Sequence, residues 1–142
     1  MFNAIEILSS SLSAMRLRAN TIASNIANAE TTKTPEGGPY KRRDVVISAK
    51  PMHSTFSSAL DEMTLMRPSA SAVLVDNSPP RKVHQPWHPQ ADEQGYVAYP
   101  NINVVQSMTD MMSASRAYEA NVNAIRTMRK MMLDAQRIGN TY

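Results

Sequence analysis

The sequence contains no cysteine and few aromatic or glycine residues. Among 142 residues there are two phenylalanines, one tryptophan and four glycines. Without cysteine the chain has neither disulfide bonds nor thiolate metal sites. The cysteine content therefore does not indicate whether the protein works in an oxidising or a reducing compartment. It also lacks the apolar run of about eighteen residues that a membrane-spanning helix needs, and any run of five or six like charges. We therefore expect neither a bilayer-spanning helix nor a tail for nucleic acid or membranes.

The N-terminus also lacks the features of a secretory signal. No cationic segment followed by a continuous apolar core is present, and Glu6 and a group of serines interrupt the place of that core. A cleavable signal peptide is therefore not expected. Methionine is abundant, with eleven residues that are concentrated toward the C-terminal end. Methionine side chains suit packing against several different neighbours, although the ordinary core of a helix explains them equally well.

The first long pattern is a repeat of apolar residues between Asn3 and Ala29. It predicts an amphipathic helix with a narrow apolar stripe, which needs a partner along its whole length. Asn3 and Glu6 have the spacing of a capping box at the start of this helix. The apolar residues, separated by steps of three and four, are Ile5, Leu8, Leu12, Met15, Ala19, Ile22, Ile26 and Ala29.

A second helix is predicted after Pro100, with either Asn101 or Asn103 as its N-terminal cap and Gly139 as its stop. Arg129 interrupts its apolar stripe, and four further apolar residues widen the stripe beyond a two-stranded seam. The stripe comprises Val104, Met108, Met111, Ser115, Tyr118, Val122, Ile125 and Met132, and the widening residues are Val105, Met112, Met128 and Met131.

The middle of the chain, residues 31–100, cannot form one long helix because it holds all nine prolines. Short strands are predicted at Asp44–Ser48, Ala72–Asp76, Arg81–His84 and Tyr96–Tyr99, each bounded by proline, glycine or asparagine. The stretch from Pro51 to Pro68 fits a short helix or a loop equally well.

These patterns predict a mainly α fold in which two long terminal helices pair as a coiled-coil-like stem, with a small irregular β-containing middle region. We expect three parts: residues 1–34 as the N-terminal helix of the stem, residues 35–100 as the middle region, and residues 101–142 as the C-terminal helix. The narrow stripes suggest that the stem packs with other subunits. The candidate subunit-packing residues are Ile5, Leu8, Leu12, Met15, Ile22, Asn25, Ile26, Asn28, Val104, Met108, Met111, Tyr118, Asn121, Val122, Ile125 and Met132.

Asparagine is a mediocre helix former, yet Asn20, Asn25 and Asn28 all lie in the first helix, and Asn121 and Asn123 lie in the second. They are either exposed polar positions or amides that bond across to neighbouring helices. We favour the second interpretation, because a polar residue beside a coiled-coil seam can fix its register.

No catalytic, cofactor or metal site is predicted. His84 and His88 have the spacing of a helical zinc site, but Pro86 lies between them and the glutamate of a metalloprotease is missing. No serine lies in the sequence context of a nucleophile or of a phosphate-binding loop. The sequence therefore does not indicate an enzyme.

Lys41, Arg42 and Arg43 form the densest basic cluster of the chain. Aromatic residues are not interleaved with this cluster, and Asp44 follows it directly where a strand is predicted. Nucleic-acid binding is therefore less favoured than a solvated or interfacial strand edge.

Two regions resemble a known family. The run Ala23–Ala29, with the sequence Ala-Ser-Asn-Ile-Ala-Asn-Ala, resembles the opening signature of flagellar rod and hook proteins. Gly37 and Gly38 before Pro-Tyr, and the runs His88–Val105 and Asp110–Val122, resemble the FlgC family in particular. The likeness covers both ends and most of the middle, and is absent from about Pro51 to Ser71.

This resemblance implies a structural subunit of the proximal rod of the bacterial flagellar basal body, which assembles helically and transmits torque. The implied partners are other copies of the chain, the rod proteins FlgB, FlgF and FlgG, FliE, and the flagellar type III export apparatus. It further implies a rod within the periplasm, reached without a cleaved signal peptide. The alternatives are another axial protein such as FlgB, which shares the N-terminal signature, and a non-flagellar helical adaptor or DNA-associated dimer.

Overall fold

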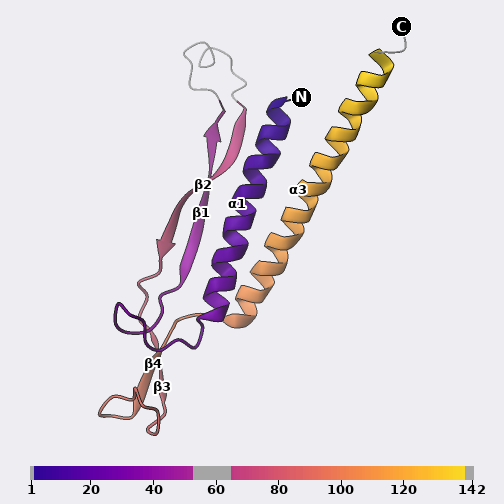
Figure 1. Cartoon of the computed structure of the whole chain (residues 1–142). Coiled ribbons are helices and arrows are strands. Elements are labelled where there is room, and N and C mark those ends of the chain that lie inside the picture. The colour runs from indigo at the N-terminus through magenta and orange to yellow at the C-terminus, as the bar shows by residue number, and fades with distance from the viewer. Residues whose placement is uncertain (1, 53–64, 140–142) are drawn as a thin grey trace.

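The computed structural model describes residues 2–52 and 65–139 and consists of two long helices and two antiparallel hairpins. The helices α1 and α3 lie side by side, and the first hairpin lies along α1 on the other side from α3 (Figure 1). The elements are α1 at Phe2–Ala27, β1 at Arg43–Pro51, β2 at Met66–Val75, β3 at Arg81–His84, β4 at Tyr96–Tyr99 and α3 at Val104–Gly139. The expected mainly α fold with a β-containing middle is confirmed.

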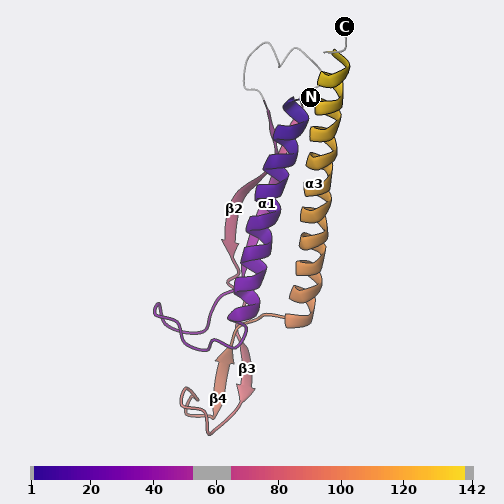
Figure 2. The ribbon, with the colours of Figure 1, turned by 45° about the vertical axis from the view of Figure 1, so that its right-hand side comes forward.

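The stem therefore has three layers, with α1 in the middle. Helix α1 packs against β1, β2 and α3, whereas α3 packs against α1 alone among the described helices and strands. The second hairpin, β3–β4, projects beyond the stem at the end opposite the start of α1 and the end of α3 (Figure 2). Because α3 has 36 residues and α1 has 26, the last turns of α3 extend past the start of α1.

Helix α1 begins and ends slightly earlier than its pattern predicts. It starts at Phe2, so Asn3 lies in the first turn and not at the N-cap position. It ends at Ala27, two residues before the expected Ala29. The amide nitrogen of the Asn28 side chain donates to the Ser24 carbonyl at 2.9 Å, and its oxygen accepts from the Thr31 hydroxyl at 3.2 Å. The Ser24 carbonyl also accepts from the Asn28 backbone N–H at 3.1 Å, so the side-chain bonds add to that pairing and attach Thr31 to the end of the helix.

Helix α3 begins at Val104 with Asn103 as its cap. The side-chain oxygen of Asn103 accepts a hydrogen bond from the Gln106 backbone N–H at 3.1 Å, which is the geometry of an N-cap. Of the two candidate caps, Asn103 is thus confirmed. The helix continues to Gly139 and, at about 1.5 Å per residue, is roughly 54 Å long.

The strands β1 and β2 form a longer hairpin than the sequence predicts. Their pairing runs from Arg43 opposite Val75 to Pro51 opposite Met66, with a shift of register between Val46 and Ile47. Pro68 is tolerated in β2 because a strand of a two-stranded sheet keeps one edge open. The second part of the ambiguous stretch therefore belongs to a strand, while residues 53–64, which include the Met63 of the possible short helix, lie outside the described residues.

The strands β3 and β4 have the bounds that the sequence predicts, and this prediction is confirmed. Gly95 has a φ of +78° in the turn before β4, where its N–H donates to the Asp92 carbonyl at 2.9 Å. A Cβ at this position would also lie 3.1 Å from the His84 ring. Glycine is therefore required at the turn for both its conformation and its size.

The core of the described chain is thin. Its buried apolar residues are small, with Ala14 on α1, Ala114 on α3, Ala29 after α1 and Val97 on β4. Most of the larger apolar side chains of the stem are only half-buried. The stem thus leaves much of its apolar surface within reach of a neighbouring molecule.

Candidate functional site

A polar contact lies in the middle of the interface between α1 and α3. The side-chain amide of Asn121 donates a hydrogen bond to the Ser11 hydroxyl at 2.8 Å. Both residues are half-buried and lie between apolar positions of the two stripes. A hydrogen bond inside an otherwise apolar contact fixes which turns of the two helices face each other, because a slipped register would leave these groups unpaired. The Asn121 side chain thus bonds across to another helix, within the same chain.

Asn25 has a different partner from the one that the sequence indicates. Its side chain is 3% exposed, donates to the Arg43 carbonyl at 2.7 Å and accepts from the Arg43 N–H at 3.0 Å. Its oxygen also accepts from the Tyr40 hydroxyl at 3.2 Å. These bonds join Asn25 to Tyr40 and Arg43 and not to another helix, so within the described residues its partner differs from the predicted one. They instead hold the start of β1 to the last turns of α1.

The other end of the hairpin is also attached to α1. Arg67 of β2 forms an ion pair of 2.8 Å with Glu6, and the Ser10 hydroxyl donates to the Pro68 carbonyl. These contacts link residues about sixty positions apart in the chain. Because both its ends are held, the hairpin covers one side of α1 over most of its length, and the other side is left for α3 and for neighbours.

The candidate packing residues divide by exposure. Asn25 is buried, and Met108 and Tyr118 are exposed, with 52% and 39% of their surface accessible. The remaining residues are half-buried, and they are Ile5, Leu8, Leu12, Met15, Ile22, Ile26, Asn28, Val104, Met111, Asn121, Val122, Ile125 and Met132. A half-buried apolar side chain has one side in the present contact and another accessible to a further partner.

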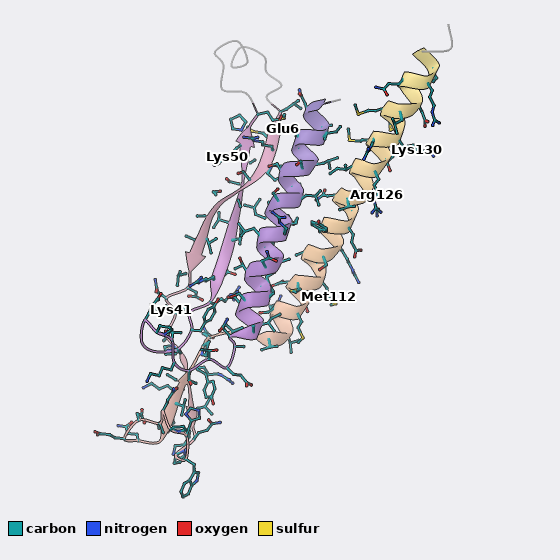
Figure 3. The ribbon with its side chains drawn as sticks, in the orientation of Figure 1. Glu6, Lys41, Lys50, Met112, Arg126 and Lys130 are labelled. Carbon is teal, nitrogen blue, oxygen red and sulfur yellow. The ribbon has the colours of Figure 1, made fainter. Side chains whose placement is uncertain are left out.

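An apolar stripe lies on one exposed face at the start of α3. Val105, Met108 and Met112 are 75%, 52% and 56% exposed and follow each other at steps of three and four. We call these three residues the α3 stripe. Farther along the helix the exposed side chains include basic residues such as Arg126 and Lys130 (Figure 3) and further apolar residues, so the outer surface of α3 is mixed there. No described helix or strand covers the α3 stripe.

His84 and His88 both contact aromatic rings. The rings of His84 and Tyr96 lie 5.1 Å apart, and those of His88 and Tyr99 lie 6.4 Å apart. The Nδ1 atom of His88 accepts from the Gln90 N–H at 3.2 Å. Within residues 2–52 and 65–139, no three side chains of histidine, aspartate or glutamate gather in a way that would hold a metal. None of the described helices has the length and apolar character to cross a bilayer.

One carboxyl group of the middle region has a shifted pKa. The Ser78 hydroxyl donates to the Asp76 carboxylate at 2.5 Å and the Ser78 N–H donates to it at 2.8 Å. These two hydrogen bonds, with a smaller contribution from the Arg42 charge, lower the pKa of Asp76. Bonds to the charged form have this effect because they stabilise the carboxylate. They make the turn that leaves β2 a defined structure.

Two family models match the parts of the chain that form the stem. The model described as "Flagella basal body rod protein" matches residues 5–33, and "Flagellar basal body rod FlgEFG protein C-terminal" matches residues 93–138. The first covers most of α1 and the turn after it, and the second covers β4, the Asn103 cap and nearly all of α3.

Full-length relatives decide between the branches of the family. The chain is 36% identical to the flagellar basal-body rod protein FlgC of Borreliella burgdorferi over 147 residues, which covers 97% of each chain. It is 36% identical to FlgC of Salmonella typhimurium, with 98% of each chain covered, and 33% identical to FlgC of Bacillus subtilis, with 97% covered. The chain belongs to the FlgC family of flagellar basal-body rod proteins.

Membership of the FlgC family favours the rod interpretation over FlgB and over a helical adaptor. The matched regions carry the residues that the structure shows in structural contacts, Asn25 in the first and Asn103 and Asn121 in the second. The hairpin β1–β2 lies between the two matched regions. Sequence analysis missed its attachment to α1, and only the strong strand formers at the start of β1 indicated that a sheet was there.

Proposed function

We propose that this chain is a structural subunit of the proximal rod of the flagellar basal body, and that it assembles helically with other rod subunits to transmit torque. The observation that carries the proposal is the α3 stripe. Three large apolar side chains are exposed on a helix that packs against α1 alone among the described helices and strands. A long helix with one covered and one uncovered apolar face is suited to a position between neighbours in a bundle.

The half-buried candidate residues of α1 and α3 are proposed to contribute to the same subunit contacts. Their apolar stripes follow the three-and-four spacing that knobs-into-holes packing requires. Helices packed side by side around an axis resist twisting, because a rotation of one subunit must displace many contacts at once. The thin core supports this proposal, since a chain with few buried side chains gains stability from neighbours.

The partners and the location that the family implies for this chain are proposals as well. The partners are other copies of the chain, FlgB, FlgF, FlgG, FliE and the flagellar type III export apparatus. The rod lies in the periplasm, and the subunit reaches it without a cleaved signal peptide. The work of the chain is mechanical and not catalytic, a proposal that its membership of a family of rod proteins supports.

Deletion and complementation test the proposed function. A strain without this chain should be non-motile and should lack rods in electron micrographs of its basal bodies, and the intact gene should restore both. A strain that keeps complete rods after deletion would show that the chain is not a rod subunit. The adaptor interpretation would then be the one to pursue.

A further inference from the structure

The β3–β4 hairpin carries the most exposed aromatic residue of the described chain. Trp87 is 98% exposed, and it is the only tryptophan in the sequence. It lies in the loop between β3 and β4, next to Pro86 and two residues before Pro89. Large aromatic side chains are usually well buried, and when one is presented on a surface it commonly anchors a contact with another molecule.

The loop that presents Trp87 is held in place by its neighbours. The Gln85 N–H donates to the Gly95 carbonyl at 2.8 Å, and the His88 N–H donates to the Gln85 carbonyl at 3.1 Å. The Tyr99 hydroxyl donates to the Gln85 side chain at 2.8 Å. With its backbone fixed on both sides, Trp87 loses little conformational freedom when it binds, which makes it an effective anchor.

A pocket of matching size lies at the junction between the stem and the β3–β4 hairpin. Its volume is about 220 Å³. For comparison, a cavity of about 150 Å³ is enough to hold benzene, so two fused rings fit in the larger volume. Three chain segments form the pocket: the loop before β1, the connection between β2 and β3, and the connection between β4 and α3. The lining residues that the argument uses are Pro39, Tyr40, Lys41, Arg42, Pro80 and Pro100.

The chemistry of the pocket suits an indole ring. Pro39, Pro80 and the Tyr40 ring supply flat apolar surface, and the two cations can interact with the electron-rich face of an aromatic ring. Pro100 is buried and Pro39 and Tyr40 are half-buried, so this part of the wall is already packed before a ligand arrives. Pro80 is exposed at the surface.

We propose that Trp87 of one copy of this chain inserts into the Pro39–Tyr40–Pro80–Pro100 pocket of a second copy. Within one chain the two do not meet, because Trp87 is almost fully exposed. Both halves of the contact belong to this sequence, which makes a second copy the occupant that the observations favour. An exposed apolar residue that fits a pocket elsewhere on the same molecule forms a head-to-tail contact, which repeats into an open helical array.

The placement of the two features also sets a direction for the contact. The β3–β4 hairpin projects along the long axis away from the stem (Figures 1 and 2). Its strands have four residues each, which is about 13 Å at the rise of a β-strand. The second copy must therefore be displaced along the axis by at least that length. This inference rests on the proposed function, because it is the rod that brings copies together.

Cysteine cross-linking tests the contact directly, since the chain has no cysteine of its own. One copy carries Pro86→Cys, which keeps the adjacent Trp87 side chain, and the other carries Ser78→Cys, a residue that lines the pocket. Both are expressed together, basal bodies are purified, and the thiols are oxidised. We expect a covalent dimer of this chain for that pair. The control pair replaces Ser78→Cys with Asn20→Cys, an exposed position on α1, and should give none.

Three results would overturn the inference. The first is the absence of a dimer although both variants are present in the basal bodies. The second is an equal amount of dimer for the control pair. The third is a cross-link from position 86 to a different rod protein only. In all three the chain is still found in the rod, so the proposed function stands. Absence of the unmodified chain from basal bodies would instead remove the proposed function.

A measurement without substitutions covers the case in which the variants fail to assemble. Hydroxyl-radical footprinting compares the oxidation of Trp87 in the isolated chain with its oxidation in intact basal bodies. We expect Trp87 to be modified severalfold more slowly in basal bodies, together with reduced modification of Pro80 and Tyr40. If Trp87 is oxidised equally fast in both samples, it is not inserted in a pocket and the inference is wrong.

Discussion

Ser11 of α1 and Asn121 of α3 are joined by a hydrogen bond of 2.8 Å across the stem, although they are 110 residues apart in the chain. This bond fixes the register of the two helices and therefore the face of α3 that remains open. The two helices run in opposite directions (Figure 1). Asn25, fourteen residues after Ser11 in α1, is therefore level with Ser107, fourteen residues before Asn121 in α3. The hairpin attachment at Asn25 and the α3 stripe around Ser107 are thus at the same height of the stem.

Loss of the Asn121 bond should weaken the pairing of the helices. Asn121→Ala leaves the Ser11 hydroxyl without this partner at a half-buried position, and we expect about 0.5–1.5 kcal/mol less unfolding free energy. Urea denaturation of the full chain, followed by circular dichroism, measures the change. Asn123→Ala on an exposed position of the same helix is the matched control, and an equal loss in both variants would contradict the role of the bond.

Substitution of Asn25 should detach the start of the hairpin. Asn25→Ala removes the acceptor of the Arg43 N–H and leaves buried polar groups unpaired, each of which costs about 1–3 kcal/mol. Hydrogen exchange of the Arg43 amide should become markedly faster. Asn20→Ala, exposed on the same helix, should leave this exchange unchanged. Unaltered protection of Arg43 in the Asn25 variant would refute the assignment.

The cap of α3 should depend on Asn103 and not on Asn101. Asn103→Ala removes the acceptor of the Gln106 N–H and should lower stability by about 1 kcal/mol. Asn101→Ala, two residues earlier and also exposed, should have little effect. Thermal unfolding of the two variants separates these outcomes, and a larger loss for Asn101 would contradict the observed cap.

The α3 stripe should matter for assembly but not for the fold of the single chain. Met112→Glu places a charge on an exposed side chain, so the helicity of the isolated chain should stay unchanged. In the rod the same charge would be buried against a neighbour, and motility in soft agar should fall severely. Ser113→Glu, also exposed but on another face of the helix, is the control and should support swimming. Normal swimming of both strains would show that the stripe is not an interface.

The turn after β2 should respond to acid in a defined direction. Because hydrogen bonds lower the pKa of Asp76, its carboxylate contributes stability above the pKa of the unfolded chain, and this is lost as the pH falls through the folded value. Ser78→Ala removes the first of these bonds and should raise the pKa of Asp76. Carboxyl NMR titration measures this shift, and an unchanged pKa would contradict the assigned cause.

Local signals predicted the elements whose ends are marked in the sequence. The bounds of β3 and β4 were predictable because proline and glycine stand beside these strands, whereas the asparagines before α3 left Asn101 and Asn103 as alternative caps. The full length of β1 and β2 was not predictable. Pro51 and Pro68 predict the ends of strands. A strand tolerates proline only at an open edge, and the strand pairing that creates such an edge is known only from the structure.

The candidate site was predictable in part for a related reason. The three-and-four spacing indicates which residues lie on the apolar faces of the helices, but not which part of a face is covered within the chain. Asn25 illustrates the limit, because its partner is the backbone of Arg43, and that contact depends on the path of the intervening loop. The pocket near Pro80 likewise brings together three distant segments, a placement that no local pattern encodes.

The central claim is that this chain is a subunit of the flagellar rod, and quantitative peptide mass spectrometry of purified hook–basal bodies tests it most directly. The chain should be present at a level comparable to that of other rod proteins, and it should remain after washing that removes loosely bound proteins. Its absence from intact basal bodies, with the chain recovered from the cytosol instead, would contradict the claim.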